Sequence, residues 1–290
     1  MNDYFQILSE VAPEFWTSPA MLAMVFVFGS IWGSFLNVCV YRIPRAISVV
    51  TPGSHCGSCA SPVAWYDNLP ILSWFILRGR CRKCHATFSF RYPLIEALTG
   101  AVFLLTWIYF GPSWLTLAYW LFLFGLLVGT FIDFEFYILP DRITLGGMVI
   151  GLVASVLVPA LHEAGPDERL LALTRSAIGL GLGWGVLYLV RVMGELAFRK
   201  EAMGLGDVKL LGAIGAFIGW QGVLFTLIAS FSSPNCSNSP ILPSSCRFLS
   251  RSASIWRSVI EIVRPACGCG TTTLAIRSMW SSKNRGLSRR

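Results

Sequence analysis

The chain has 290 residues, of which 54% are hydrophobic and only 13% are charged, with a formal net charge of +8. So apolar a composition excludes an ordinary soluble domain and indicates a protein that crosses a membrane several times. The positive charge is concentrated at one end. The segment from Phe231 onward holds nine Lys/Arg and one acid, and subtracting these from 23 and 15 leaves 14 of each before it. We expect membrane lipid around the protein and no nucleic-acid partner.

Two long stretches without any charge open the series of predicted spans, at residues 15–41 and 97–132. The second is long enough for two crossings, since one crossing needs roughly 20 apolar residues, and Gly111-Pro112-Ser113 is a natural turn in its middle. Further spans are predicted at 143–161, 176–190 and 210–230, which makes six. Acidic rather than basic residues precede the first stretch, so it is predicted to be a retained span and not a cleavable signal peptide.

The loop between the first two spans is basic, which predicts its side of the membrane. Up to Tyr92 it has one acid, Asp67, against seven basic residues: Arg42, Arg45, Arg78, Arg80, Arg82, Lys83 and Arg91. Loops rich in Lys and Arg stay in the cytoplasm, so the N-terminus is predicted to lie outside. The cytoplasm also keeps thiols reduced and available for metal.

The same loop contains two C-x-x-C pairs, Cys56-Gly-Ser-Cys59 and Cys81-Arg-Lys-Cys84. Paired motifs at this separation predict a zinc site of four thiolates, which closes a tetrahedron and is therefore structural. Four free cysteines are the alternative. Each C-x-x-C pair with its turn is called a knuckle below. His55 and His85 each lie next to a cysteine of a knuckle, and neither is expected to be a metal ligand.

Two aspartates are predicted at the ends of different spans on one membrane face. Asp133 lies near the end of the third span, and Asp207 lies in Gly204-Leu-Gly206-Asp207 where the sixth begins. Two carboxylates in a partly dry site share a proton, which provides one base and one acid for peptide hydrolysis. The flanking glycines allow a tight bend and close approach of a substrate. Taken alone, Asp207 could instead be a helix N-cap and Asp133 a solvated boundary residue.

Together these features resemble the bifunctional type IV prepilin leader peptidase/N-methyltransferase family. The resemblance covers most of residues 20–230. It rests on the two cysteine pairs and on four further segments: Gly33-Ser-Phe-Leu-Asn37-Val-Cys-Val-Tyr41-Arg42-Ile-Pro44, Arg91-Tyr-Pro-Leu-Ile-Glu96, Asp133 with Leu139-Pro140-Asp141, and Gly204-Leu-Gly-Asp207.

The resemblance implies that Asp133 and Asp207 are the catalytic pair. It implies cleavage after the glycine of a short basic leader, usually before phenylalanine, in type IV prepilins or type II secretion pseudopilins. It also implies methylation of the new amino terminus with S-adenosylmethionine, in the bacterial inner membrane with the active site at the cytoplasmic face. Asp141, Glu96 and Asn37 are candidate supporting residues. Glu96 could hold the amine or the donor or pair with a nearby arginine, and Asn37 could line the site or join two helices.

The expected fold is an all-α polytopic membrane protein, with about six spans here against a usual eight in the family, and a small cytoplasmic zinc-ribbon-like loop. The predicted parts are an external N-terminus (1–19), a first span (20–41), a zinc-binding and methyltransferase loop (42–95), a membrane aspartyl peptidase domain (96–230) and an atypical tail (231–290). The abrupt Ser- and Arg-rich composition of the tail favours a changed reading frame after Ser230 over a disordered extension.

Two other functions remain open at the level of sequence. Membrane aspartates with a regulatory zinc loop also suit a proton- or cation-coupled transporter, although a transporter is expected to place its acids near the bilayer midplane. The second alternative is a peptidase that the altered tail has inactivated.

Overall fold

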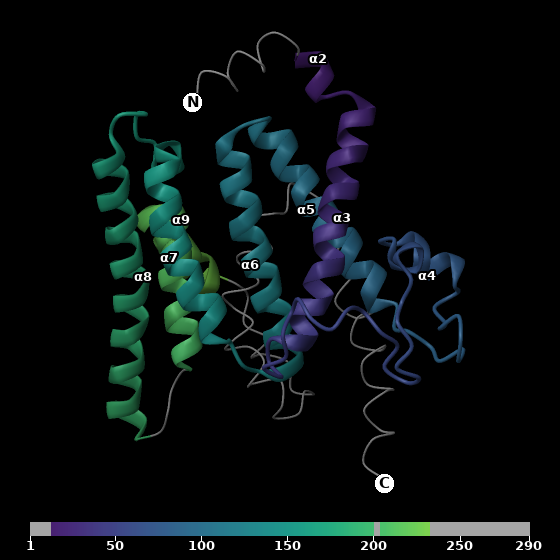
Figure 1. Cartoon of the computed structure of the whole chain (residues 1–290). Coiled ribbons are helices and arrows are strands. Elements are labelled where there is room, and N and C mark those ends of the chain that lie inside the picture. The colour runs from purple at the N-terminus through teal and green to yellow at the C-terminus, as the bar shows by residue number, and fades with distance from the viewer. Residues whose placement is uncertain (1–12, 200–203, 233–290) are drawn as a thin grey trace. The chain divides into compact units, whose positions relative to one another are not determined.

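The computed structural model describes residues 13–199 and 204–232 (Figure 1). Within these ranges the chain is helical, and its only β structure is two isolated bridges, His55 with Pro62 and Arg80 with Thr87. The expectation of an all-α chain with a small loop domain is therefore confirmed. Phe231 and Ser232 end the last helix, and the rest of the predicted atypical tail lies outside the described residues.

Six long helices form the bundle: α3 (Pro19–Arg42), α5 (Arg91–Phe110), α6 (Trp114–Phe136), α7 (Asp141–Leu157), α8 (Arg169–Phe198) and α9 (Leu205–Ser232). Short elements lie between and before them: α2 (Pro13–Trp16), η1 (Trp65–Asn68), α4 (Leu72–Ile76) and η2 (Pro159–His162). Five helices, α3, α5, α6, α8 and α9, are long and apolar enough to cross a membrane. The prediction of a polytopic membrane protein is thus supported.

Helix α7 is shorter than the predicted span at 143–161. It has 17 residues, which corresponds to about 26 Å at 1.5 Å per residue. It ends at Leu157 because Pro159 follows two residues later. A residue before proline avoids the α conformation, and Val158 has φ −128° and ψ 76°.

Glycines allow two helix pairs to approach closely. Helix α3 packs along α5, where a Cβ added at Gly33 would lie 2.7 Å from the Cα of Glu96. Helix α8 packs along α9, where a Cβ at Gly179 would collide with the carbonyl oxygen of Gly215. Small residues at such crossings are the usual means by which membrane helices associate.

One buried apolar cluster fixes α3, α5 and α6 to one another near the end of α6. Its members are Leu36, Cys39, Val40, Ile95, Val128 and Ile132. Ile132 is fully buried in this cluster and immediately precedes Asp133. The packing of three helices therefore determines where Asp133 is presented. We call the end of the bundle that bears residues 43–90 the loop face.

Candidate active site and metal centre

Asp133 and Asp207 come together at the loop face from α6 and α9. Helix α6 ends three residues after Asp133, where Tyr137 turns into the left-handed conformation and its N–H bonds to the Asp133 carbonyl at 2.9 Å. Asp207 is the third residue of α9. Both side chains are partly buried, and the charge of Asp133 acts on the Asp207 carboxyl group. Within the described ranges neither carboxylate has a hydrogen-bond or ion-pair partner, so both are open to water or substrate.

The alternative reading of Asp207 as an N-cap is wrong. Helix α9 begins at Leu205, so Asp207 lies inside its first turn, with Gly204 just before the helix. A carboxylate in a first turn is still favoured by the helix dipole.

Gly206 lets the turn after α6 approach the start of α9. A Cβ at Gly206 would lie 2.9 Å from the Cβ of Leu139, whereas a Cβ at Gly204 would meet its closest atom, an Asp207 carboxylate oxygen, at 3.9 Å. The hydrogen at Gly206 therefore makes room for Leu139, and this contact brings the two aspartate-bearing segments together.

Two ion pairs surround the aspartates. Lys209 of α9 contacts Asp141 at the start of α7, with 2.6 Å between Nζ and Oδ1. Arg91 at the start of α5 contacts Glu135 of α6, with 2.8 Å between Nη2 and Oε2. The two residues of each ion pair lie 68 and 44 positions apart in the sequence, respectively. No sequence pattern predicts a pair at such a separation. Asp141, a candidate supporting residue, thus positions α9 through Lys209.

Glu96 and Asn37 lie in the α3–α5 interface. The Glu96 carboxylate accepts a hydrogen bond from the Ile71 N–H at 2.7 Å, and therefore ties the loop to α5. Asn37 donates to the carbonyls of Gly33 and Tyr92, each at 3.3 Å, and its buried Oδ1 has no partner among the described residues. Asn37 therefore joins two helices, as one of its two readings expected.

The suggested pairing of Glu96 with a nearby arginine is not found. Arg91 contacts Glu135, while Arg42 donates to the carbonyls of Ser48 and Gly53 in the loop. From the described part of the loop, Glu96 accepts a neutral backbone N–H, that of Ile71. A peptide N–H of a folded loop leaves no pattern in the sequence that marks it as a partner for a carboxylate.

The four loop cysteines converge in space. The sulfurs of Cys56, Cys59, Cys81 and Cys84 all lie within 4.8 Å of one another, and those of Cys56 and Cys84 are 3.7 Å apart. Tetrahedral zinc with Zn–S bonds of about 2.3 Å requires sulfurs about 3.8 Å apart. The donor set therefore fits a closed zinc site. In the described part of the chain, no histidine joins this cluster.

The two knuckles repeat one local geometry. The N–H of Ala60 bonds back to the Cys56 carbonyl, and the N–H of His85 bonds back to the Cys81 carbonyl. Both Ala60 and His85 have positive φ, at 54° and 57°. His85 therefore serves its knuckle through its backbone. This repetition explains why the spacing alone was sufficient to predict the cluster.

Hydrogen bonds prepare some of these thiols for metal, since the thiolate is the ligand form. The hydroxyl and backbone of Ser61 lower the pKa of Cys59 to about 6. Backbone amides of Cys84 and Lys83 lower the pKa of Cys81. The Ala86 amide acts in the same sense on Cys84, but desolvation and the neighbouring sulfurs outweigh it and raise the pKa of Cys84 to about 12. Four thiolates this close repel one another, and a dication would relieve that repulsion.

Comparison with known proteins bears directly on these two sites. A family model for the bacterial peptidase A24 N-terminal domain matches residues 27–110, and one for the type IV leader peptidase family matches residues 120–233. The prepilin leader peptidase/N-methyltransferase of Klebsiella pneumoniae is 35% identical over 224 residues, which is 74% of this chain and 94% of that one. The chain belongs to the type IV leader peptidase family. Proteins of the same name from Aeromonas hydrophila and Myxococcus xanthus (strain DK1622) are 34% and 37% identical.

The family matches divide the two sites between them. The Aeromonas match covers 72% of this chain and 77% of that one, and the Myxococcus match covers 72% of this chain and 60% of that one. No solved structure matches the chain. The four cysteines fall within the N-terminal match, and Asp133 and Asp207 fall within the peptidase match.

Proposed function

We propose that this protein removes the basic leader from type IV prepilins or type II secretion pseudopilins and methylates the new amino terminus. The observation that supports it most is the convergence of two otherwise unpartnered carboxylates from α6 and α9. The relatives named for both activities support it further.

In the proposed cleavage Asp133 and Asp207 act as one unit. One carboxylate takes a proton from water, whose oxygen attacks the peptide carbonyl carbon, while the other donates its proton to the carbonyl oxygen. When the tetrahedral intermediate collapses, the C–N bond breaks and the leaving amine receives a proton from the pair. Because the two side chains are only partly buried, water and substrate can reach them from the loop face.

The position of the pair at helix ends suits a substrate with a soluble leader and an apolar helix. The apolar helix would lie in the bilayer, and the leader would remain outside it, so the scissile bond would meet the level of Asp133 and Asp207. The basic loop favours the cytoplasmic side of the bacterial inner membrane for this site. A transporter would be expected to hold its acids near the bilayer midplane, and the location of this pair speaks against that alternative.

The geometry gives Glu135 and Asp141 no free charge with which to attract a cationic leader. Both carboxylates are already compensated, by Arg91 and Lys209 respectively. We therefore attribute to them the positioning of α6 and α7 relative to their neighbours.

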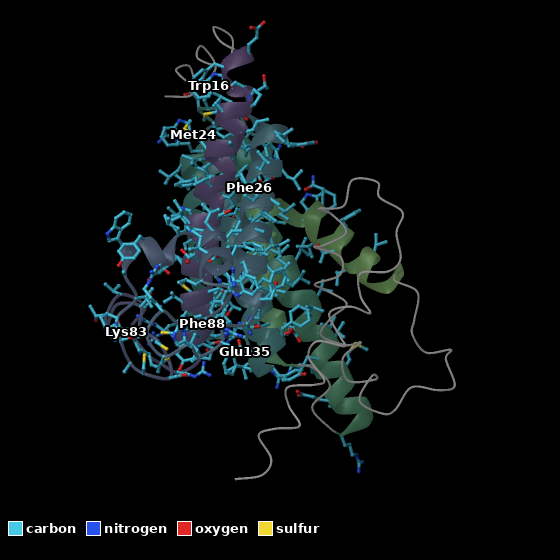
Figure 2. All side chains as sticks on the ribbon, turned by 90° about the vertical axis from the view of Figure 1, so that its right-hand side faces the viewer. Trp16, Met24, Phe26, Lys83, Phe88 and Glu135 are labelled. Atoms are coloured by element: carbon cyan, nitrogen blue, oxygen red, sulfur yellow. The ribbon has the colours of Figure 1, made fainter. Side chains whose placement is uncertain are left out.

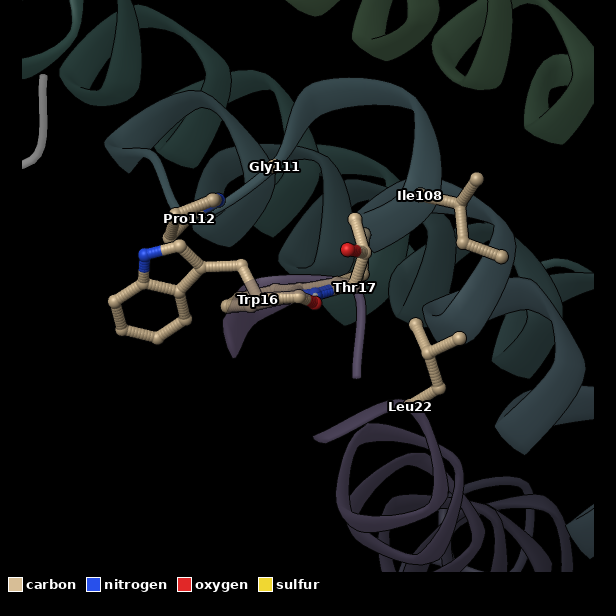
Figure 3. Close-up of a pocket in the computed structure, with 7 residues that line it drawn as sticks. Trp16, Thr17, Leu22, Ile108, Gly111 and Pro112 are labelled. Carbon is tan, nitrogen blue, oxygen red and sulfur yellow. Dashed lines mark hydrogen bonds between the residues drawn. The ribbon is translucent and has the colours of Figure 1, made fainter. Parts of the chain in front are cut away.

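Methyl transfer rests on the names of the relatives, and neither of two pockets in the described part of the chain fits a bound S-adenosylmethionine. A pocket of about 350 Å³ at the opposite end of the bundle is lined by residues such as Trp16, Thr17 and Pro112 (Figure 3). A second, apolar pocket lies between α7 and α8. Neither lining includes a charged residue, which a cationic nucleoside with a carboxylate would require. Glu96 already accepts a bond from Ile71.

We assign a structural zinc ion to Cys56, Cys59, Cys81 and Cys84. Four thiolates leave no open position on the metal, so it would supply folding stability and no catalytic water. The loop between the knuckles is too short to fold on an apolar core of its own, and the metal would join its two ends.

Mass spectrometry of the N-terminal peptide of a prepilin tests the proposal. Membranes containing this chain and S-adenosylmethionine should remove the leader and add one methyl group. The Asp133→Asn and Asp207→Asn variants should leave the precursor intact, and Asp67→Asn, which removes a carboxylate paired with Arg82 in the loop, serves as the control. An uncleaved precursor with the unmodified chain would contradict the proposal and leave the transporter or the inactive peptidase.

A further inference from the structure

Helix α4 exposes an apolar face that the zinc loop does not cover. Leu72, Phe75 and Ile76 are spaced i, i+3, i+4 and are 60%, 57% and 68% exposed. The opposite face holds Ser73 and Trp74, which bond to the carbonyls of Tyr66 and Phe88 and so attach α4 to the rest of the loop. An amphipathic element that turns its large side chains outward needs an apolar partner.

The attachment of α4 to the bundle sets its depth. The Ile71 N–H, immediately before α4, bonds to Glu96, which lies five residues or about 7.5 Å inside α5. Helix α5 is a candidate membrane span, and Leu94 and Leu98 are exposed on it, 49% and 43%. Helix α4 therefore lies alongside the end of this span and not beyond it, as Figure 1 shows.

The second cysteine knuckle provides a contrast within the same loop. Figure 2 places Lys83 near the level of Glu135, at the helix ends, and Figure 1 shows α4 alongside α5 and not below it. Residues of the knuckle are therefore expected to lie in water when α4 is at the level of lipid.

Two positive charges follow the apolar face closely in the chain. Arg78 and Arg80 follow α4 and are exposed. Arg82, by contrast, is already paired with Asp67. An apolar face followed by two exposed arginines matches the acyl chains and the phosphates of an anionic leaflet, because each arginine can extend its charge to the headgroups.

We propose that α4 is an interfacial helix that inserts Leu72, Phe75 and Ile76 among lipid acyl chains, with Arg78 and Arg80 at the phosphates of anionic lipids. The zinc loop then rests on the membrane beside the spans and does not hang free below them. Continuity with the lipid-facing residues of α5 favours lipid over a water-soluble partner. This inference concerns placement only and holds whether or not the proposed catalysis is correct.

Photocrosslinking tests the insertion of the apolar face. The full chain, carrying Asp207→Asn, is placed in nanodiscs of equal parts phosphatidylglycerol and phosphatidylcholine, with p-benzoylphenylalanine at position 75, 76 or 83. We expect phospholipid adducts by mass spectrometry at 75 and 76, several-fold above those at Lys83. Equal adducts at all three positions, or crosslinks from 75 and 76 to a second copy of the chain, would overturn the proposal.

The headgroup preference is tested in the same discs. Adducts at position 76 should be enriched in phosphatidylglycerol, and the pair Arg78→Gln and Arg80→Gln should abolish the enrichment while total lipid adducts remain. Unchanged enrichment would refute the role of the two arginines. Monodisperse elution of each variant and normal hydrogen exchange of α3 serve as controls for folding.

Discussion

The bond between Ile71 and Glu96 should determine how firmly the zinc loop is held to the bundle. Glu96 is 8% exposed, and its carboxylate accepts a hydrogen bond from the Ile71 N–H at 2.7 Å. A hydrogen bond to a charged group contributes about 1.5–3 kcal/mol, so Glu96→Ala should destabilise the attachment by that amount. Since 1.4 kcal/mol corresponds to a factor of ten, exchange of the Ile71 amide should accelerate roughly 10- to 150-fold.

Hydrogen–deuterium exchange of the loop peptides measures this effect. Glu96→Gln keeps an acceptor and should give a smaller acceleration than Glu96→Ala. Asp67→Ala, which removes an ion pair within the loop, should leave exchange at Ile71 nearly unchanged. If Glu96→Ala left exchange at Ile71 at the unmodified rate, the bond would not hold the loop, and the depth inferred for α4 would lose its support.

Three further outcomes follow from the geometry. Strong chelation, or Cys59→Ser, should remove one zinc per chain and increase proteolysis within the loop, while α8 and α9 stay protected. A metal-free chain whose loop resists proteolysis as well as that of the unmodified chain would contradict the zinc assignment. Gly179→Ala should destabilise the α8–α9 contact by roughly 1–3 kcal/mol and lower the apparent Tm by roughly 2 to 12 °C. Gly181→Ala, with open space around its added Cβ, should leave the Tm unchanged. Equal Tm shifts in the two variants would refute the close packing at Gly179. Burial lowers the pKa of His162 below its unfolded value of about 6.5, so between the two values only the unfolded chain binds the proton, and the free energy of unfolding should fall from pH 7 to pH 5. His162→Gln should flatten that fall. An equal dependence of unfolding free energy on pH in the variant and the unmodified chain would contradict this reasoning.

Local patterns in the sequence predicted the features that depend on neighbouring residues. The charge-free stretches identified the spans, because a bilayer crossing is a local demand for apolar residues. The C-x-x-C spacing predicted the sulfur cluster, since each knuckle closes within five residues. The length of α7 was overestimated because hydropathy continues past Val158 although Pro159 ends the helix.

The contacts that position the site could not be read in the same way. Asp141 and Lys209 lie 68 residues apart, and only the packing of α7 against α9 brings them together. Glu96 offered two arginines as partners by proximity in sequence or charge, yet a peptide N–H of the folded loop bonds to it. Such partners are determined by tertiary structure.

The central claim is that Asp133 and Asp207 form one catalytic unit, and a double variant tests it most directly. Leader cleavage would be measured for Asp133→Asn, Asp207→Asn and both together, with Asp67→Asn, whose carboxylate pairs with Arg82 in the loop, as the control. If the two carboxylates act together, each single variant should cleave about 10²- to 10⁴-fold more slowly than the unmodified chain. The double variant should then cleave no more slowly than the less active of the two single variants. Losses that multiply in the double variant, or substantial cleavage by either single variant, would contradict the account.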